Sequence, residues 1–244
     1  MEVYLKSDIG LVRTSNQDAC KCGSFSDQAV WAVVCDGMGG ANGGNVASEV
    51  AVETVAQFLT QEYDKALTND QTVDLLTGVV QRANSKLYEM QKADQMLRGM
   101  GTTIELVLVK ENKAHIVHVG DSRVYAIREN KIQQLTVDHS VVHEMVEKGE
   151  LTPEQAMVHP NKNYITRALG IVPQIHLDYI EAPFEPGDKI LLCSDGLTNY
   201  LTPEEIVRLS LENSADAFTQ ALVEGAKGLG GSDNITVAVI TAQQ

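Results

Sequence analysis

Residues 30–40 read VWAVVCDGMGG, and this stretch decides the fold. Six apolar residues, rich in valine, predict a buried β-strand over residues 30–35. The strand ends at Asp36, and the glycines that follow allow a sharp bend of the backbone and an accessible carbonyl oxygen. A carboxylate at the end of a buried strand is well placed to hold a hard cation such as Mg²⁺ or Mn²⁺, which prefers oxygen ligands.

Three further aspartates stand beside apolar runs elsewhere in the chain. Asp121 lies between two such runs, Asp195 follows residues 189–193, and Asp233 precedes residues 235–241. Each aspartate alone is explained as well by turn chemistry, because Asp-Gly and Asp-Asn pairs are common in turns. Together they predict a fold that gathers distant carboxylates at one place, as the site of a metal-dependent hydrolase requires.

The rest of the chain alternates predicted strands with amphipathic helices. β-Branched runs predict further strands at residues 103–109, 115–119, 124–127, 189–193 and 235–241. Two Glu-Asn-Lys connections, at residues 111–113 and 129–131, join apolar runs and indicate antiparallel hairpins. Apolar periodicity and capping signals predict helices at residues 47–59, 76–90, after Thr202-Pro203, and near 215–227. This pattern favours an α+β fold in which helices pack on antiparallel sheets.

Composition narrows the class of protein. The 244 residues are 43% hydrophobic and contain no linker-like stretch, so a single domain over residues 1–244 is expected. With 33 acidic and 19 basic residues the formal net charge is −14, which disfavours nucleic acid and anionic membranes as partners. No signal peptide or membrane-spanning run is recognisable, so a cytoplasmic location with four reduced cysteines is expected.

Residues 138–169 form the least regular part of the sequence. Such a stretch predicts a flap beside a binding site, although a plain surface excursion explains it equally well. His139 and His143 are four residues apart, a spacing that places two ligands on one helical face. A third ligand is missing nearby, and a zinc site is therefore disfavoured.

Six short motifs together resemble those of the type 2C metal-dependent protein phosphatases, and they occur in the family's order across nearly the full chain. They are residues 13–18 (RTSNQD), 36–40 (DGMGG), 101–103 (GTT), 119–123 (VGDSR), 192–197 (LCSDGL) and 231–236 (GSDNIT). The resemblance, to a bacterial member, implies a four-layer α-β-β-α sandwich of two antiparallel β-sheets flanked by helices.

The resemblance also implies a metal centre with two Mn²⁺ or Mg²⁺ ions. In the family, the residue matching Asp36 bridges both ions, and those matching Asp195 and Asp233 complete the first site. The carbonyl group matching Gly37 serves the second ion, and Asp121 with Asp195 would hold a third. A paired-metal site lowers the pKa of a bridging water, which then attacks phosphorus directly.

Two more residues take substrate roles by resemblance. Asp18 looks like the residue that orients the attacking water, and Arg13 like the one that binds the substrate phosphate. Arginine suits that task because its planar guanidinium donates two parallel hydrogen bonds. The expected activity is therefore hydrolysis of phosphoserine and phosphothreonine in proteins, with a Ser/Thr kinase as a plausible counterpart.

Three positions depart from the family pattern. Met38 and Ala41 occupy places where many members carry a histidine proposed as general acid, and Gln17 replaces a common glutamate. General acid catalysis typically contributes roughly 10² to 10⁴ in rate, so modest activity on poor leaving groups is expected. The missing histidine keeps one alternative open, a weak or inactive phosphatase-fold module that binds phosphoproteins or a kinase. A two-metal nuclease conflicts with the negative charge.

Overall fold

The computed structural model describes residues 1–242, except for the side chains of residues 40–42. Its strands form two antiparallel sheets. The first sheet contains β1 (Glu2–Asp8), β7 (Arg123–Arg128), β8 (Lys131–Gln134), β10 (Lys189–Cys193) and β11 (Ile235–Thr241), in the order β1-β11-β10-β7-β8. The second contains β2 (Asp18–Ser24), β3 (Val30–Met38), β5 (Ile104–Lys110), β6 (Lys113–Val119) and β9 (Asp178–Pro183), in the order β2-β3-β5-β6-β9, and the short β4 (Gly101–Thr102) pairs with β3.

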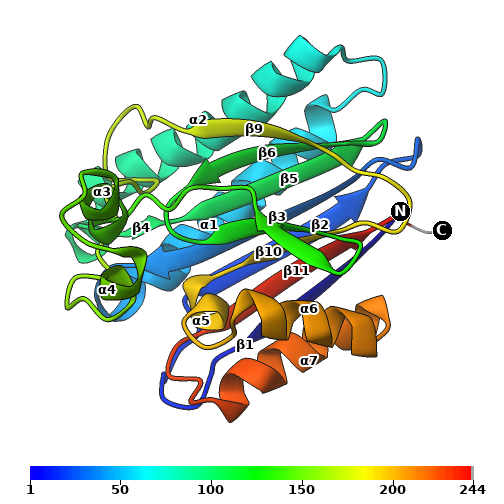
Figure 1. Cartoon of the computed structure of the whole chain (residues 1–244). Helices are drawn as coiled ribbons and strands as arrows, with labels where there is room; N and C mark the ends of the chain where they lie inside the picture. Colours follow the sequence, from blue (N-terminus) through cyan, green and yellow to red (C-terminus); the bar gives the residue numbers. More distant parts are fainter. Residues whose placement is uncertain (243–244) are drawn as a thin grey trace.

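Helices cover the outer faces of both sheets (Figure 1). The second sheet packs against α1 (Gly40–Glu62) and α2 (Asn69–Ala93), with the turn η1 (Gln95–Leu97) after them. The first sheet packs against α5 (Asp195–Thr198), α6 (Pro203–Glu212) and α7 (Ala215–Gly228). Two short helices, α3 (Val141–Glu147) and α4 (Pro153–Met157), lie at one end of the sandwich (Figure 1). The four-layer arrangement of two antiparallel sheets between helices is thus confirmed.

The strand that opened the sequence argument is buried on both faces. Val30, Ala32 and Val34 point into the core between the two sheets. Trp31, Val33 and Cys35 point to the opposite side, into the core under α1 and α2. Because successive side chains of a strand alternate between faces, a strand between two cores must be apolar at every position. This explains why residues 30–35 lack polar residues.

Both predicted hairpins are present. In the β5–β6 and β7–β8 turns, the Glu and Asn residues at positions 111–112 and 129–130 all have positive φ angles. Two consecutive positive φ angles are what a two-residue hairpin turn with the twist of its strands requires. The meander of antiparallel strands inferred from the Glu-Asn-Lys connections is therefore confirmed.

Besides the two-residue β4, the strands that sequence patterns did not predict are β1, β2, β8 and β9, and each of these four lies at the edge of its sheet. Their residues are mostly half-buried or exposed, so the apolar pattern is weak. The irregular region at residues 138–169 contains α3 and α4, which are only seven and five residues long. Such short helices carry too few turns for apolar periodicity to reveal them. In the described part of the chain, no helix is both long and apolar enough to cross a membrane.

Candidate active site

A cleft of about 270 Å³ opens where the predicted motifs meet. Six of the residues singled out in the sequence line it: Arg13, Asp36, Gly37, Asp121, Asp195 and Asp233. They come from separate elements: the end of β3, the turn between β6 and β7, the start of α5, and the loops before β2 and β11. The fold therefore brings together side chains that are up to 220 residues apart in sequence, such as Arg13 and Asp233.

Asp36 and Asp18 face one another across the β2–β3 pairing. The backbone of Asp36 is fixed by Thr103, whose Oγ1 accepts from the Asp36 amide at 2.9 Å and whose amide donates to the Asp36 carbonyl at 2.9 Å. Asp18 is buried, and its Oδ2 accepts a hydrogen bond from Ser194 Oγ at 2.8 Å. Strand register and these hydrogen bonds hold both carboxyl groups at the same end of the sandwich.

Gly37 follows Asp36 in a place that has no room for a side chain. A Cβ built there would lie 2.1 Å from the Gly44 carbonyl oxygen and 2.5 Å from the Gln17 carbonyl oxygen. The Gly37 amide also donates to the Gln17 carbonyl at 3.0 Å. The backbone of α1 and the segment before β2 can approach β3 this closely only because residue 37 is glycine.

The carboxyl groups of the cleft repel one another. Burial, followed by the charges of Asp18 and Asp195, raises the pKa of Asp36 well above its ordinary value. Burial and neighbouring aspartates also raise the pKa of Asp18 and of Asp121 to about 7. Burial and Asp233 raise the pKa of Asp195. The group therefore carries more negative charge than its surroundings compensate.

Arg13 supplies one positive charge to this group. Its Nη2 donates to Asp233 Oδ2 at 2.8 Å, and half of its side chain remains exposed. This hydrogen bond raises the pKa of Arg13, with the nearby charges of Asp36 and Asp195 adding to the effect. A half-exposed guanidinium among the residues that line the cleft has donors that can bind an anion.

The donor set fits divalent cations. Asp18 Oδ1 is buried and has no hydrogen-bond partner, and a buried unpaired carboxylate oxygen is costly unless a cation or water satisfies it. The surrounding ligands are carboxylate and carbonyl oxygens, which Mg²⁺ and Mn²⁺ prefer. Within residues 1–242, no three His, Cys, Asp or Glu side chains are close enough together to form a ready-made metal site, although four aspartates line the same cleft. The fit therefore rests on charge, donor type and the unpaired oxygen.

Several residues that support the site had no role assigned from the sequence, although all but Asn199 lie within the quoted motifs. They are hydrogen-bonding side chains beside the aspartates, namely Thr103, Ser122, Ser194, Asn199 and Asn234. Asn199 Nδ2 donates to Asp195 Oδ2 at 3.0 Å. Asn234, in the loop before β11, connects to the loop between β1 and β2 by accepting from the Gln17 amide and donating to the carbonyl groups of Ile9 and Ser15. Asn234 was readable as part of the Ser-Asp-Asn motif, whereas Asn199 had no sequence signal.

Met38 lines the cleft at one of the two places where a histidine was sought. The side chain of the other, Ala41, lies outside the described residues. His139 and His143 do not come together, because His139 precedes α3 and contacts Asp178, whereas His143 lies within α3 near Glu147. All four cysteines are free thiols, as expected.

Comparisons with known proteins place the sequence and the fold in a family. The family model described as protein phosphatase 2C matches residues 12–229. The chain is 38% identical over 246 residues to protein phosphatase PhpP of Streptococcus pneumoniae, covering 100% of this chain and 98% of that protein. Its fold is similar to that of the S. agalactiae serine/threonine phosphatase, with a TM-score of 0.92, 35% identity and 99% of each chain covered.

A second solved structure bears on the metal centre. The catalytic domain of the serine/threonine protein phosphatase PstP in complex with two manganese ions has a TM-score of 0.85 and 32% identity, covering 98% of this chain and 96% of that one. The family model spans most of the sequence, and the relatives align from end to end. On these grounds, the chain belongs to the protein phosphatase 2C family.

Proposed function

We propose that this protein removes phosphate from phosphoserine and phosphothreonine residues of other proteins in a metal-dependent reaction. The observation that carries this function is the convergence of Asp36, Asp121, Asp195 and Asp233 on one cleft, with Arg13 at its rim. Family membership supports the same reaction. We propose the whole of residues 1–244 as one catalytic domain in which residues 138–169 serve as a flap.

The metal ligands proposed are Asp36, Gly37, Asp195 and Asp233 for two ions, with Asp121 and Asp195 for a third. Mn²⁺ or Mg²⁺ suits these oxygen ligands, and the manganese-bound neighbour supports a two-ion site. When bound, such ions neutralise the clustered charge and lower the pKa of water so that hydroxide forms near neutral pH.

The chain's own residues would bind the substrate phosphate and orient the attacking water. Asp18 does not line the cleft, but it pairs with Asp36 across the β2–β3 strands and has one buried, unpaired oxygen, which would accept a proton or a hydrogen bond from a water beside Asp36. Arg13 would exchange its contact with Asp233 for the phosphate and donate to two of its oxygens. Met38 cannot donate a proton to the leaving group, so we expect slower turnover of esters with poor leaving groups.

The flap borders a second cleft, of about 460 Å³, which shares Asp121, Asn163 and Asp195 with the first. This continuity supports phosphoproteins, rather than only small phosphate esters, as substrates. A Ser/Thr kinase as physiological counterpart and a cytoplasmic location follow from the resemblance and composition, and we propose both on that basis.

The test replaces Asp36 with asparagine, which keeps the shape and removes the charge. Asp36→Asn should abolish Mn²⁺-dependent phosphate release from a phosphothreonine peptide and from p-nitrophenyl phosphate. Asp74→Asn is the matched control, because Asp74 is exposed on α2, away from the cleft. Retained turnover in Asp36→Asn would refute the assignment. If the unmodified protein binds Mn²⁺ in a calorimeter but releases no phosphate, the binding-module alternative is correct instead.

A further inference from the structure

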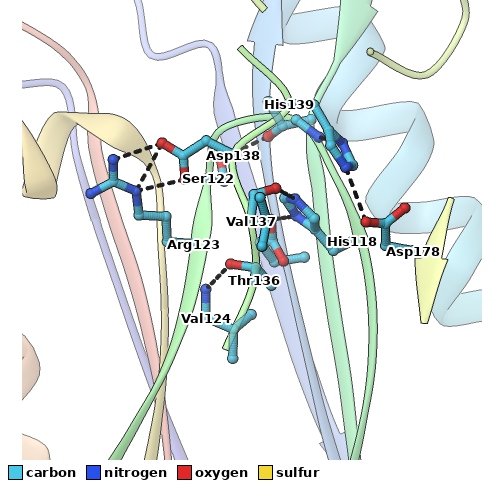
Figure 2. Close-up of polar contacts among 12 residues, drawn as sticks. His118, Ser122, Arg123, Val124, Thr136, Val137, Asp138, His139 and Asp178 are labelled. Atoms are coloured by element: carbon cyan, nitrogen blue, oxygen red, sulfur yellow. Dashed lines mark hydrogen bonds and ion pairs between the residues drawn. The ribbon is translucent and has the colours of Figure 1, made fainter. Parts of the chain in front are cut away.

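Residues 136–139, which we call the strap, lie beside His118, Ser122, Arg123 and Val124 (Figure 2), and the strap is bonded to Gly120 in the turn that carries Asp121. The strap connects β8 to α3, and each of its residues is hydrogen-bonded to the β6–β7 region. The contacts are Val124 N to Thr136 Oγ1 at 3.0 Å, His118 Nε2 with the Val137 carbonyl at 2.8 Å, Arg123 Nη2 to Asp138 Oδ2 at 2.6 Å, and the His139 amide to the Gly120 carbonyl at 2.7 Å.

His139 contacts Gly120 twice. Besides the bond from its own amide, its Nδ1 accepts from the Gly120 amide at 3.1 Å. Gly120 has a φ of +120°, and a Cβ there would lie 2.5 Å from Thr103 Cγ2. Gly120, the residue directly before Asp121, is therefore constrained in two ways. Thr103 leaves no room for a Cβ on one side, and on the other side its amide and its carbonyl group are both hydrogen-bonded to His139.

The imidazole of His139 is itself held in one orientation. Nε2 lies 3.3 Å from Asp178 Oδ2 and 3.0 Å from Arg167 Nη1. Because the Gly120 amide can only donate, Nδ1 must accept, and the ring is neutral with its proton on Nε2, directed toward Asp178. Arg167 Nη1 then donates to Asp178 Oδ1 and not to the ring. Burial, helped by the charges of His118 and Arg167, lowers the pKa of His139 to about 4, consistent with that neutral form. The His118 ring packs against it at a centroid distance of 4.4 Å, and His118 Nδ1 bonds to the buried Glu105 at 2.5 Å.

The same residue marks the base of the flap. The His139 carbonyl accepts from the Thr166 amide at 2.8 Å, and Ser140 pairs with Ile165. Arg167, on the returning segment, donates to Asp178 Oδ1 at 2.9 Å. His139 thus contacts the Asp121 turn on one side and both ends of the flap on the other.

We propose that His139 is a positioning residue: by holding Gly120 from both its amide and its carbonyl, it aims the Asp121 carboxylate into the cleft and sets the affinity of the ion bound there. This inference rests on the metal-ligand role proposed above for Asp121. His139 itself does not line the cleft, so it acts through the turn and not by contact with substrate.

Two substitutions test the two ring nitrogens of His139 separately. In His139→Asn, the amide lies near the place of Nδ1 and its oxygen can accept from Gly120, whereas contact with Asp178 is lost. In His139→Gln, the longer side chain reaches the place of Nε2 and leaves the Gly120 amide without its acceptor. Mn²⁺ alone is titrated into the full-length chain by calorimetry. We expect roughly 10- to 100-fold weaker binding of one ion in His139→Gln and nearly unchanged binding in His139→Asn.

Controls identify the path of the effect. Asp178→Asn alters the outer partner of the ring and should bind Mn²⁺ like the unmodified protein. In an Asp121→Asn background, His139→Gln should cause no further loss of Mn²⁺ affinity. The KM for a phosphopeptide should stay constant in His139→Gln, and saturating Mn²⁺ should restore most of its kcat.

Several results would overturn the proposal. Equal affinities in the Asn and Gln variants, or additive losses in the Asp121→Asn background, would show that His139 acts elsewhere. If His139→Gln does not fold, His139→Asn still tests the proposal: weaker Mn²⁺ binding by a His139→Asn variant that melts at the temperature of the unmodified protein would also overturn it. Unaltered binding in Asp121→Asn would remove the ligand role on which the inference depends. If the unmodified protein shows no phosphatase activity, the proposed function is refuted but this inference is not, because the comparison of Mn²⁺ affinities needs no turnover.

Discussion

Substitution of Gly37 by alanine tests the site while leaving every carboxylate in the chain. The added Cβ would lie 2.1 Å from the Gly44 carbonyl oxygen and 2.5 Å from that of Gln17, whereas Cβ contacts below 3.0 Å essentially never occur. Both oxygens belong to the backbone, so no side chain can turn away, and the segments must separate by about 1 Å. Overpacking of this kind costs about 1–3 kcal/mol of stability. A displacement of about 1 Å beside Asp36 predicts a loss of roughly 100-fold in kcat/KM.

The assay combines thermal unfolding with kcat/KM for a phosphopeptide at saturating Mn²⁺. Gly228→Ala is the matched control, because Gly228 ends α7 and an added Cβ there meets nothing within 4 Å. That variant should keep full activity and gain up to about 1 kcal/mol, since alanine restricts the unfolded chain. If Gly37→Ala stays within twofold of the unmodified protein in kcat/KM and melts at the same temperature, the close approach of α1 to β3 does not position the site.

Three further predictions follow from charges in and around the cleft. Arg13→Lys keeps the charge but loses the forked donor, so kcat/KM for phosphopeptides should fall roughly 10- to 100-fold, mainly through a higher KM; an unchanged KM would contradict phosphate binding by Arg13. The pKa of His139 is about 4 in the folded chain and about 6.5 when unfolded, so its neutral form stabilises the fold above pH 6.5 and loses that contribution as the pH falls toward 4. The stability of the unmodified protein relative to His139→Asn should therefore fall by about 3 kcal/mol between pH 7 and pH 4 in urea titrations, and a constant difference would refute the neutral assignment. Because the pKa of Asp18 and of Asp121 is about 7, Mn²⁺ binding should release protons and tighten from pH 6 to pH 8; calorimetric heats that do not depend on the buffer's ionisation enthalpy would count against this.

Strands buried on both faces were predictable, whereas edge strands were not. The run at residues 30–35 is apolar throughout because it separates two cores, and its pattern needs no tertiary information. Strand β2 carries Asp18, two cysteines and a lysine, and it becomes a strand through its register with β3. Pairing with β3, rather than the apolar pattern of its own residues, makes β2 a strand. The helices within residues 138–169 were missed because they span one or two turns.

The sequence by itself determined which residues are the candidates for the chemistry. Asp36, Asp121, Asp195 and Asp233 were recognisable because an apolar run that begins or ends near an aspartate, with a glycine or asparagine next to it, is visible in the order of residues. Only the tertiary structure decided how the surroundings of these residues are arranged. It leaves one oxygen of Asp18 without a partner, crowds the backbone at Gly37, and joins His139 of the strap to Gly120. Hydrogen bonds and close contacts between distant segments depend on the packing of the two sheets, and the spacing of residues along the chain contains no record of them.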